Sequence, residues 1–306
     1  MLDIAGICVY DSVLYRYLQV YAGLVMKRAY FPYRLAAVDL DGTLLSPDNK
    51  TISAANAVAI NTLRELGCEV VLASGRRHED ILPVYHELDL TAPVISSDGI
   101  LVKQPLTEEV FYEQLVEPAV ARELIREGLE REYSIYVYHS ESAFYSHHDE
   151  YTSRYQHVTR SRKPILHKNL TGLTGTKVHK VVWCGPSSKL RFEQKRLAEL
   201  FQKQLVVCES EGGYLEFMPL MSGKFAALSH LAGQLGVPEH STLAFGDGWN
   251  DVEILSRAAY SVAMSHASDD AKAAAKAIAP EGDPAESLAR AVNLVLEKFS
   301  PVCSSC

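Results

Sequence analysis

The chain has 306 residues, of which 47% are hydrophobic and 22% charged, a composition typical of a globular protein with one large or two modest domains. Its net charge of -8 argues against a general nucleic-acid or membrane-surface binder, because both of those partners are polyanionic. No stretch reaches the roughly 18 uninterrupted apolar residues of a membrane-spanning helix. We therefore expect neither a nucleic-acid nor a membrane partner.

The 6 cysteines are scattered along the sequence, which predicts reduced thiols and a cytoplasmic location. Only Cys303 and Cys306 lie close together, in the C-terminal tail. This pair either binds a metal or forms a redox disulfide, or it belongs to a disordered tail, the interpretation that the missing second pair favours.

Residues 1–34 are expected to be an N-terminal extension of uncertain role. Their apolar residues are interrupted by charges, and no small-residue cleavage site follows them, so they do not resemble a signal peptide. The interrupting residues are Asp3, Asp11, Arg16, Lys27 and Arg28. Either Met26 is an alternative start, or residues 13–25 form an additional amphipathic helix.

The first predicted strand, residues 35–38, is followed at once by Asp39 and Asp41. Gly42 breaks the strand and allows both carboxylates to turn toward one point beyond the sheet edge, where open α/β sheets bind ligands. Two anions at that point repel each other unless a cation or a shared proton lies between them. The alternative is an ordinary Asp-rich turn.

Two further units of helix and strand follow. Ser53 is expected to cap a helix that ends at Gly67, and the apolar strand 69–73 leads into Ser74-Gly75-Arg76, whose hydroxyl and backbone N–H groups suit phosphate oxygens. A third strand over residues 93–97 precedes Asp98-Gly99. This alternation predicts a parallel sheet covered by helices on both faces.

Residues 100–215 differ from the flanking segments in having aromatic strands, which predicts an inserted domain with its own sheet. Its aromatic strands cover residues 133–138 and 180–184. From residue 151 to 190 the segment contains eight lysines or arginines and no acidic residue. Such a segment is either a solvated basic face or a lid that covers an anionic substrate.

The alternation then resumes. Ser222 is expected to cap a helix that ends at Gly236 and buries Phe225, Leu228, Leu231 and Leu235. Lys224 then lies in the first turn, where the helix dipole disfavours a cation unless an anion lies in front of it. The alternative is an ordinary surface lysine. A buried strand, 241–246, leads into Asp247, Asn250 and Asp251, oxygen ligands suited to a hard cation or its support. A last strand, 260–264, and helices capped by Ser268 and Asp283 complete the pattern.

Four ordered motifs resemble those of the haloacid dehalogenase superfamily of phosphatases: Asp39-Leu-Asp-Gly-Thr43, Ser74-Gly-Arg76, Lys224 and Gly246-Asp-Gly-Trp-Asn-Asp251. There are 35 residues from Asp39 to Ser74 but 150 from Ser74 to Lys224, so the insertion lies between the second and third motifs, as in the Cof-like subfamily. The resemblance implies an α/β fold, with a Rossmann-like parallel-sheet core over residues 35–99 and 216–306 and an inserted α/β cap over residues 100–215.

The resemblance also implies residue roles. Asp39 would be the nucleophile that forms an aspartyl-phosphate, and Asp41 the general acid and base. Mg²⁺ would be held by the Asp39 carboxylate, the Asp41 backbone carbonyl and Asp247. Lys224 would stabilise the transferring phosphoryl group, and Asp251 would support the site. The phosphate-binding residues would be Thr43, Ser74, Gly75, Arg76 and Asn250.

The sequence departs from Cof-like relatives at two places near the edge of the site: Asp98-Gly99 stands where Asn-Gly is usual, and Ser265-His266 stands where Gly-Asn is common. These departures concern substrate fit more than chemistry, and a role at the rim of the site or at a helix start is expected for His266. The resemblance implies a phosphatase of a small phosphorylated metabolite, such as a sugar phosphate or a phosphorylated cofactor. A phosphomutase, a phosphotransferase or a non-catalytic phosphate-ester binder is the alternative, and the sequence indicates no oligomeric state.

Overall fold

The computed structural model describes residues 31–47, 51–139, 142–159, 164–175, 177–210 and 213–299. The chain divides into two compact units, residues 1–70 with 237–306 and residues 71–236. Met26, the helix expected over residues 13–25 and the Cys303–Cys306 pair lie outside the described residues. The domain boundaries expected from the sequence, at residues 34, 99 and 215, stay a prediction.

The first unit is built on a five-stranded sheet with the order β14-β13-β12-β1-β2. Strand β1 pairs in parallel with β12, β12 with β13, and β13 with β14. Every residue of β1, β12 and β13 is buried, as expected for apolar strands covered on both faces. The predicted Rossmann-like parallel sheet is therefore confirmed. The strands are β1 (Leu35–Val38), β2 (Glu69–Leu72), β12 (Thr242–Gly246), β13 (Tyr260–Ala263) and β14 (Ala277–Ile278).

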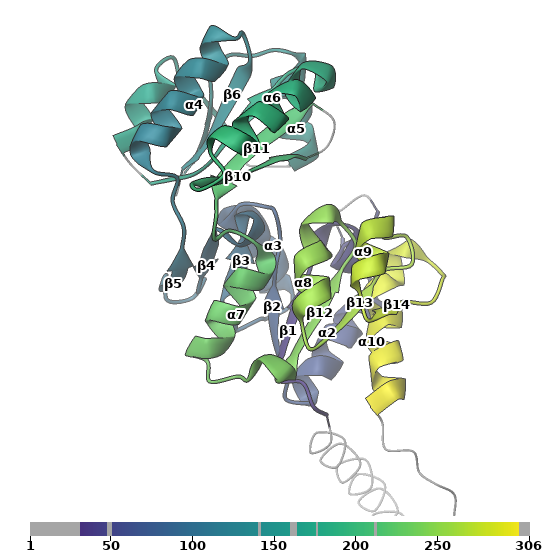
Figure 1. Cartoon of the computed structure of the whole chain (residues 1–306). Coiled ribbons are helices and arrows are strands. Elements are labelled where there is room, and N and C mark those ends of the chain that lie inside the picture. The colour runs from purple at the N-terminus through teal and green to yellow at the C-terminus, as the bar shows by residue number, and fades with distance from the viewer. Residues whose placement is uncertain are drawn as a thin grey trace, which may run out of the picture. The chain divides into compact units, whose positions relative to one another are not determined.

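Helices pack on this sheet, and α2 and α10 also contact each other, while α8 packs on β12 and β13 (Figure 1). The helices of this unit are α2 (Ala54–Glu65), α8 (Val252–Arg257), α9 (Asp269–Ala274) and α10 (Ser287–Phe299). The predicted starts of α2 and α9 are confirmed, since Ser53 accepts a hydrogen bond from Asn56 N and Ser268 accepts one from Ala271 N. Gly67 follows α2 with a φ of 79°, the left-handed conformation expected at this position.

The side chain of Asn56 ties three segments of the first unit together. It is fully buried, and its Nδ2 donates to Leu44 O at 2.8 Å and to Ala285 O at 3.0 Å. Its Oδ1 accepts from Ala289 N at 3.0 Å. The turn that follows β1 is thereby fixed to α2 and to the start of α10.

The second unit begins with a three-stranded sheet, β3-β4-β5, whose strands pair antiparallel. The sequence predicted that β3 would belong to the parallel sheet, and two contacts support this in part: Ala73 forms an isolated parallel bridge with Ile95, and Ser74 N donates to Ile95 O at 3.0 Å. Most of the pairing of β3 is instead antiparallel to β4, because the chain turns back after Gly99 and pairs Leu101 with Ser96. The elements of this part are α3 (His78–Glu87), β3 (Val94–Ser96), β4 (Leu101–Lys103), β5 (Val110–Glu113) and α7 (Lys224–Gln234).

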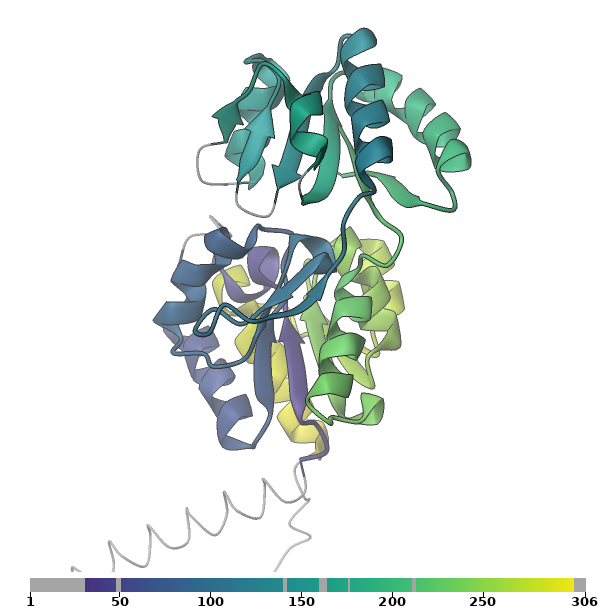
Figure 2. The same ribbon diagram turned by 90° about the vertical axis from the view of Figure 1, so that its left-hand side faces the viewer.

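The inserted domain has its own six-stranded sheet, as predicted, with the order β10-β11-β9-β6-β7-β8. Ile135 and Val137 of β6 pack in a core with residues of α4 and α6, which lie side by side on one face of the sheet (Figure 2). Tyr136 and Tyr138, the alternate residues of β6, pack with Tyr155 of α5 on the other face. The bounds are α4 (Pro118–Glu130), β6 (Ser134–His139), β7 (Ala143–Tyr145), α5 (Glu150–Thr159), β8 (Ile165–Leu166), β9 (Val178–Cys184), α6 (Ser187–Leu200), β10 (Leu205–Glu209) and β11 (Tyr214–Pro219).

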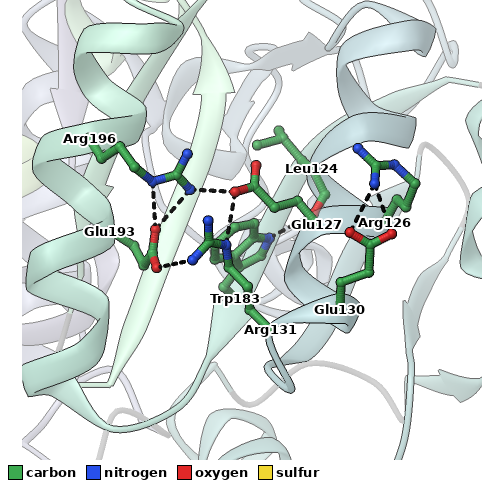
Figure 3. Close-up of polar contacts among 8 residues, drawn as sticks. All are labelled: Leu124, Arg126, Glu127, Glu130, Arg131, Trp183, Glu193 and Arg196. Carbon is green, nitrogen blue, oxygen red and sulfur yellow. Dashed lines mark hydrogen bonds and ion pairs between the residues drawn. The ribbon is translucent and has the colours of Figure 1, made fainter.

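A polar network joins α4 to α6 (Figure 3). Arg131 donates to Glu127 at 2.9 Å and to Glu193 at 3.0 Å. Arg196 donates to the same two glutamates, at 2.5 Å and 2.9 Å. The charges of the two arginines and the two glutamates therefore cancel, which compensates the buried carboxylate of Glu193.

In the described part of the chain, no helix combines the length and apolar character that a membrane crossing needs. Cys68, Cys184 and Cys208 are free thiols.

Glu113, at the end of β5, generates a testable prediction. His179 Nε2 donates to it at 3.0 Å and Lys177 Nζ at 2.6 Å, and these hydrogen bonds lower the pKa of Glu113 from 4.5 to about 2. Because the folded pKa is below the unfolded one, the carboxylate stabilises the fold above a pH of about 4.5, and this stabilisation is lost as the pH falls toward about 2. Glu113→Gln should lower the melting temperature most near neutral pH and progressively less in acid.

Thermal unfolding followed by circular dichroism at several pH values measures this difference. Glu109→Gln, a change at an exposed residue before the same strand, is the matched control and should show no such pH dependence. A Glu113→Gln deficit that is constant down to a pH of about 2 would contradict the assigned pKa shift.

Candidate active site

The pairing of β1 with β12 brings two aspartates to the same edge of the sheet. Val38 is the register partner of Phe245, and Asp39 N donates to Phe245 O at 3.0 Å. Asp39 therefore continues β1 beside the end of β12, where Asp247 follows Gly246. Because the strands are parallel, both carboxylates come from carboxyl ends, as predicted from the sequence.

A tight turn after β1, residues 40–44, places the second aspartate. Leu45 N donates to Leu40 O at 2.9 Å, and the buried side chains of Leu40 and Leu44 anchor the turn in the core. Gly42 has a φ of 85°, a conformation that an L-residue adopts only with strain. Asp41 lies in this turn and is partly exposed, whereas Asp39 is only 5% exposed.

Three carboxylates form an acidic cluster: Asp39, Asp247 and Asp251 each offer one oxygen, and these oxygens all lie within 4.8 Å of one another. Three anions at this spacing repel strongly without a counter-charge. Carboxylate oxygens are the ligands that hard cations such as Mg²⁺ prefer. The donor set therefore fits the predicted metal, and Asp41 contributes no carboxylate to it, consistent with the expectation that Asp41 uses its backbone carbonyl.

Asp251 is the member of the cluster whose importance the sequence understated, because it was expected only to support the site. Its side chain is 1% exposed, and its Oδ2 accepts hydrogen bonds from the backbone N–H groups of Asp247 and Gly248, both at 3.0 Å. It thus fixes the loop that carries Asp247 and also brings an oxygen to the cluster. Asn250 lies in the same turn, Trp249–Asp251.

Two side chains orient the loops around the cluster. Thr43 Oγ1 donates to Asp247 Oδ1 at 3.1 Å, so it positions a predicted metal ligand, and its contact with phosphate stays a prediction. His266 Nε2 donates to Gly42 O at 2.7 Å and lies 4.0 Å from Asp247 Oδ2. His266 is thus tied to the turn after β1, and its role at the rim of the site stays a prediction.

The turn after β2 contains Ser74, Gly75 and Arg76 and belongs to the second unit. Ser74 is 1% exposed, and its Oγ accepts a hydrogen bond from Arg76 N at 3.1 Å. The hydroxyl keeps its own proton, which it can donate to a phosphate oxygen. Gly75 and Arg76 complete this turn, as expected from the sequence, and their contact with phosphate stays a prediction.

Lys224 is the first residue of α7 and is 1% exposed. The alternative of an ordinary surface lysine is therefore wrong. An ammonium buried to this degree is stable only where anionic or polar oxygens face it. The predicted cap of this helix is also wrong: Ser222 Oγ donates to Pro219 O at 2.6 Å, and Gly223, with a φ of 141°, precedes the helix instead.

The predicted site residues thus fall into two groups, one in each unit of the chain. That both groups meet on one phosphoryl group stays a prediction. The first group is Asp39, Asp41, Thr43, Asp247, Asn250 and Asp251, and the second is Ser74, Gly75, Arg76 and Lys224.

Gly42 offers a test of the turn after β1. A Cβ atom at this position would collide with the carboxylate of Asp247, in addition to the strain of its positive φ. Gly42→Ala should therefore lower the free energy of unfolding by at least about 2 kcal/mol, the sum of a left-handed alanine and the displaced side chain. Chemical denaturation measures this loss.

Gly236→Ala is the matched control, since Gly236 also has a positive φ, 67°, but no atom within 4 Å of an added Cβ. It should lose only about 1 kcal/mol, from the backbone alone. Equal losses in the two variants would show that Gly42 makes no room for Asp247.

Comparisons with known proteins identify the family of the chain. The family model described as haloacid dehalogenase-like hydrolase matches residues 36–292. HMP-PP phosphatase of Serratia proteamaculans (strain 568) is 30% identical over 239 residues, which cover 77% of this chain and 85% of that protein. Phosphatase YwpJ of Bacillus subtilis (strain 168) is 27% identical over 290 residues, covering 82% and 95%.

Solved structures give the same result for the fold. A haloacid dehalogenase-like hydrolase from Bacteroides thetaiotaomicron superposes with a TM-score of 0.75 at 27% identity, covering 86% of this chain and 99% of that one. A protein from Thermotoga maritima superposes with a TM-score of 0.76 at 25% identity, covering 89% and 100%. The family and the fold expected from the sequence are confirmed, and the chain belongs to the haloacid dehalogenase-like hydrolases.

Proposed function

We propose that this chain is a cytoplasmic, Mg²⁺-dependent phosphatase that hydrolyses a small phosphorylated metabolite through an aspartyl-phosphate on Asp39. The observation that carries the proposal is the acidic cluster, in which oxygens of Asp39, Asp247 and Asp251 lie within 4.8 Å of one another at the end of the parallel sheet. The similarity to proteins named HMP-PP phosphatase and Phosphatase YwpJ supports phosphate-ester hydrolysis.

The metal would be held by the carboxylates of Asp39 and Asp247 and by the carbonyl oxygen of Asp41. When bound, it supplies positive charge that cancels the repulsion between the Asp39 carboxylate and a phosphate dianion. The hydrogen bonds from Thr43 to Asp247 and from two backbone N–H groups to Asp251 hold these carboxylates in place before substrate binds.

The chain's own residues account for both halves of the reaction. A carboxylate oxygen of Asp39 forms a bond to phosphorus while the bond from phosphorus to the leaving oxygen breaks, and Asp41 gives its proton to that oxygen. Asp41 then takes a proton from water, whose oxygen attacks phosphorus and releases the Asp39 carboxylate with inorganic phosphate. The partly exposed position of Asp41, beside the left-handed Gly42, suits a group that exchanges protons with substrate and water.

Binding of the phosphoryl oxygens would fall to the second group of residues. Ser74 keeps a hydroxyl proton to donate, and Lys224 supplies a buried positive charge. Gly75, Arg76 and Asn250 would add backbone and side-chain donors. Phosphoryl transfer asks mainly for positioning and charge stabilisation, and these residues provide both.

The nucleophile is tested by replacing Asp39. Asp39→Asn keeps the size of the side chain but removes its charge, so p-nitrophenyl phosphate hydrolysis should fall by about 1,000-fold or more. Asp270→Asn, the same change at an exposed residue of α9, is the control and should keep full activity. Activity that survives Asp39→Asn would remove Asp39 from the chemistry. Transfer of the phosphoryl group to added glycerol, in place of its release as inorganic phosphate, would identify a phosphotransferase.

The metal is tested without any measurement of turnover. A ligand that binds only the folded state stabilises it by about 2.7 kcal/mol at 100 times its dissociation constant. Mg²⁺ should therefore raise the melting temperature of the wild-type protein, and Asp247→Asn should remove that rise while Asp270→Asn keeps it. An equal rise in Asp247→Asn would contradict the assigned ligand.

A panel of phosphorylated metabolites would then identify the substrate, with sugar phosphates and phosphorylated cofactors as the first two classes.

A further inference from the structure

Residues 97–99, here called the support loop, contact both predicted phosphate-binding elements of the second unit. Asp98 N donates to Ser74 O at 3.1 Å, and Ser97 N donates to Arg76 O at 2.8 Å. On its other side, a Cβ atom added to Gly99 would collide with Gly223 O and lie 2.9 Å from Lys224 N. The support loop therefore packs against the Ser74 turn and against the start of α7.

The backbone of the support loop is strained. Ser97, Asp98 and Gly99 have φ values of 50°, 57° and 86°, three consecutive residues in the left-handed region. Each non-glycine residue in that region costs about 1 to 2 kcal/mol. Such a conformation persists only where the surrounding structure holds it.

One of the contacts that hold the support loop comes from a lysine of the six-stranded sheet of the inserted domain, here called the cap sheet. Lys180, on β9, is 3% exposed, and its Nζ lies 2.7 Å from Glu216 Oε2 of β11 and 3.5 Å from Asp98 Oδ2. Burial lowers the pKa of Lys180, but the two carboxylates outweigh that effect and raise it above its ordinary value, so the ammonium is charged. The Asp98 carboxylate in turn packs on Gly75, where an added Cβ would lie 2.8 Å from Oδ1.

Stability alone does not explain this cluster. Desolvating one ammonium and two carboxylates costs more than their attraction returns in many proteins, and apolar residues would fill the same space at lower cost. The network of Figure 3 provides the contrast, because it pairs two arginines with two glutamates and joins only α4 to α6. The Lys180 cluster instead reaches out of the cap sheet to the support loop.

We propose that Lys180 is a positioning residue: through Asp98 it holds the support loop in the strained conformation that places Ser74 and Lys224 on the phosphoryl group. Phosphate affinity thereby depends on strands β9 and β11 of the cap sheet. This inference rests on the proposed phosphatase function. All residues in this chain of contacts belong to the same unit of the structure, residues 71–236.

The test combines Lys180→Met, which keeps the length of the side chain and removes its charge, with Asp98→Asn and the double variant. Lys180→Met should raise the KM for p-nitrophenyl phosphate and the inhibition constant of inorganic phosphate by the same factor, about tenfold or more, because displaced donors make weaker charge-assisted hydrogen bonds to the phosphate oxygens. The kcat should change less. If Lys180 acts through Asp98, the double variant should be no worse than the poorer single variant.

Glu193→Gln, in the network of Figure 3, is the matched control because it removes a buried charge from the same domain. It should lower the melting temperature and leave both constants unchanged. If Lys180→Met lowers the melting temperature but leaves the KM and the phosphate inhibition constant at their wild-type values, Lys180 has only a structural role, and the proposal is overturned. Effects of Lys180→Met and Asp98→Asn that simply add would overturn it as well.

Asp98→Asn decides the matter if Lys180→Met does not fold, since asparagine tolerates the left-handed backbone and keeps the loop. Wild-type phosphate affinity in Asp98→Asn then overturns the proposal. If the wild-type protein hydrolyses no phosphate ester, calorimetric titration with inorganic phosphate and Mg²⁺ replaces the kinetics. Binding that Lys180→Met weakens supports the positioning role while removing the proposed function, and absence of any phosphate binding overturns both.

Discussion

The parallel pairing of β1 with β12 is the constraint on which the rest of the site depends. Both strands are buried on both faces, so a slip of one residue would exchange the side chains that pack on the two faces and disrupt the close packing of the core. That register places Asp39 beside the end of β12 and thus beside Asp247. The apolar core therefore holds three carboxylates closer together than their charges alone would allow, a repulsion that a bound cation would relieve.

The parts that sequence reasoning recovered are those decided locally. Apolar strands ending in aspartate, the Ser53 and Ser268 caps and the left-handed Gly67 each follow from neighbouring residues, and the structure has them. The failures concern a choice between partners that are all close in the sequence. Ser222 donates to Pro219 O rather than capping α7, and strand β3 pairs along its length with the chain that returns after Gly99. Residue type and apolar pattern do not decide between these partners and the expected ones.

The basic segment of the cap shows a similar limit of sequence reasoning. Its lysines and arginines look alike in the sequence, yet Lys180 lies in the middle of a fully buried strand while Lys177, just before that strand, is exposed. Strand pairing and contacts with Glu216 and Asp98 decide which charge is buried, and composition cannot reveal them. The cap thus contains two polar networks with different charge balance, one that joins its helices and one that extends to the residues supporting the Ser74 turn.

The buried amide of Asn56, which connects the turn after β1 with the start of α10, has a consequence for biosynthesis. The acidic cluster is assembled from both ends of the polypeptide. Strand β1, which leads into Asp39, pairs only after β12 has been synthesised, and the turn after β1 is fixed only after Ala285 and Ala289 have been added. Residues 71–236 emerge from the ribosome between these parts and can fold as a unit during translation. A nascent chain therefore carries Asp39 through most of its synthesis without Asp247 and Asp251 beside it, and the acidic cluster is complete only when α10 has been released.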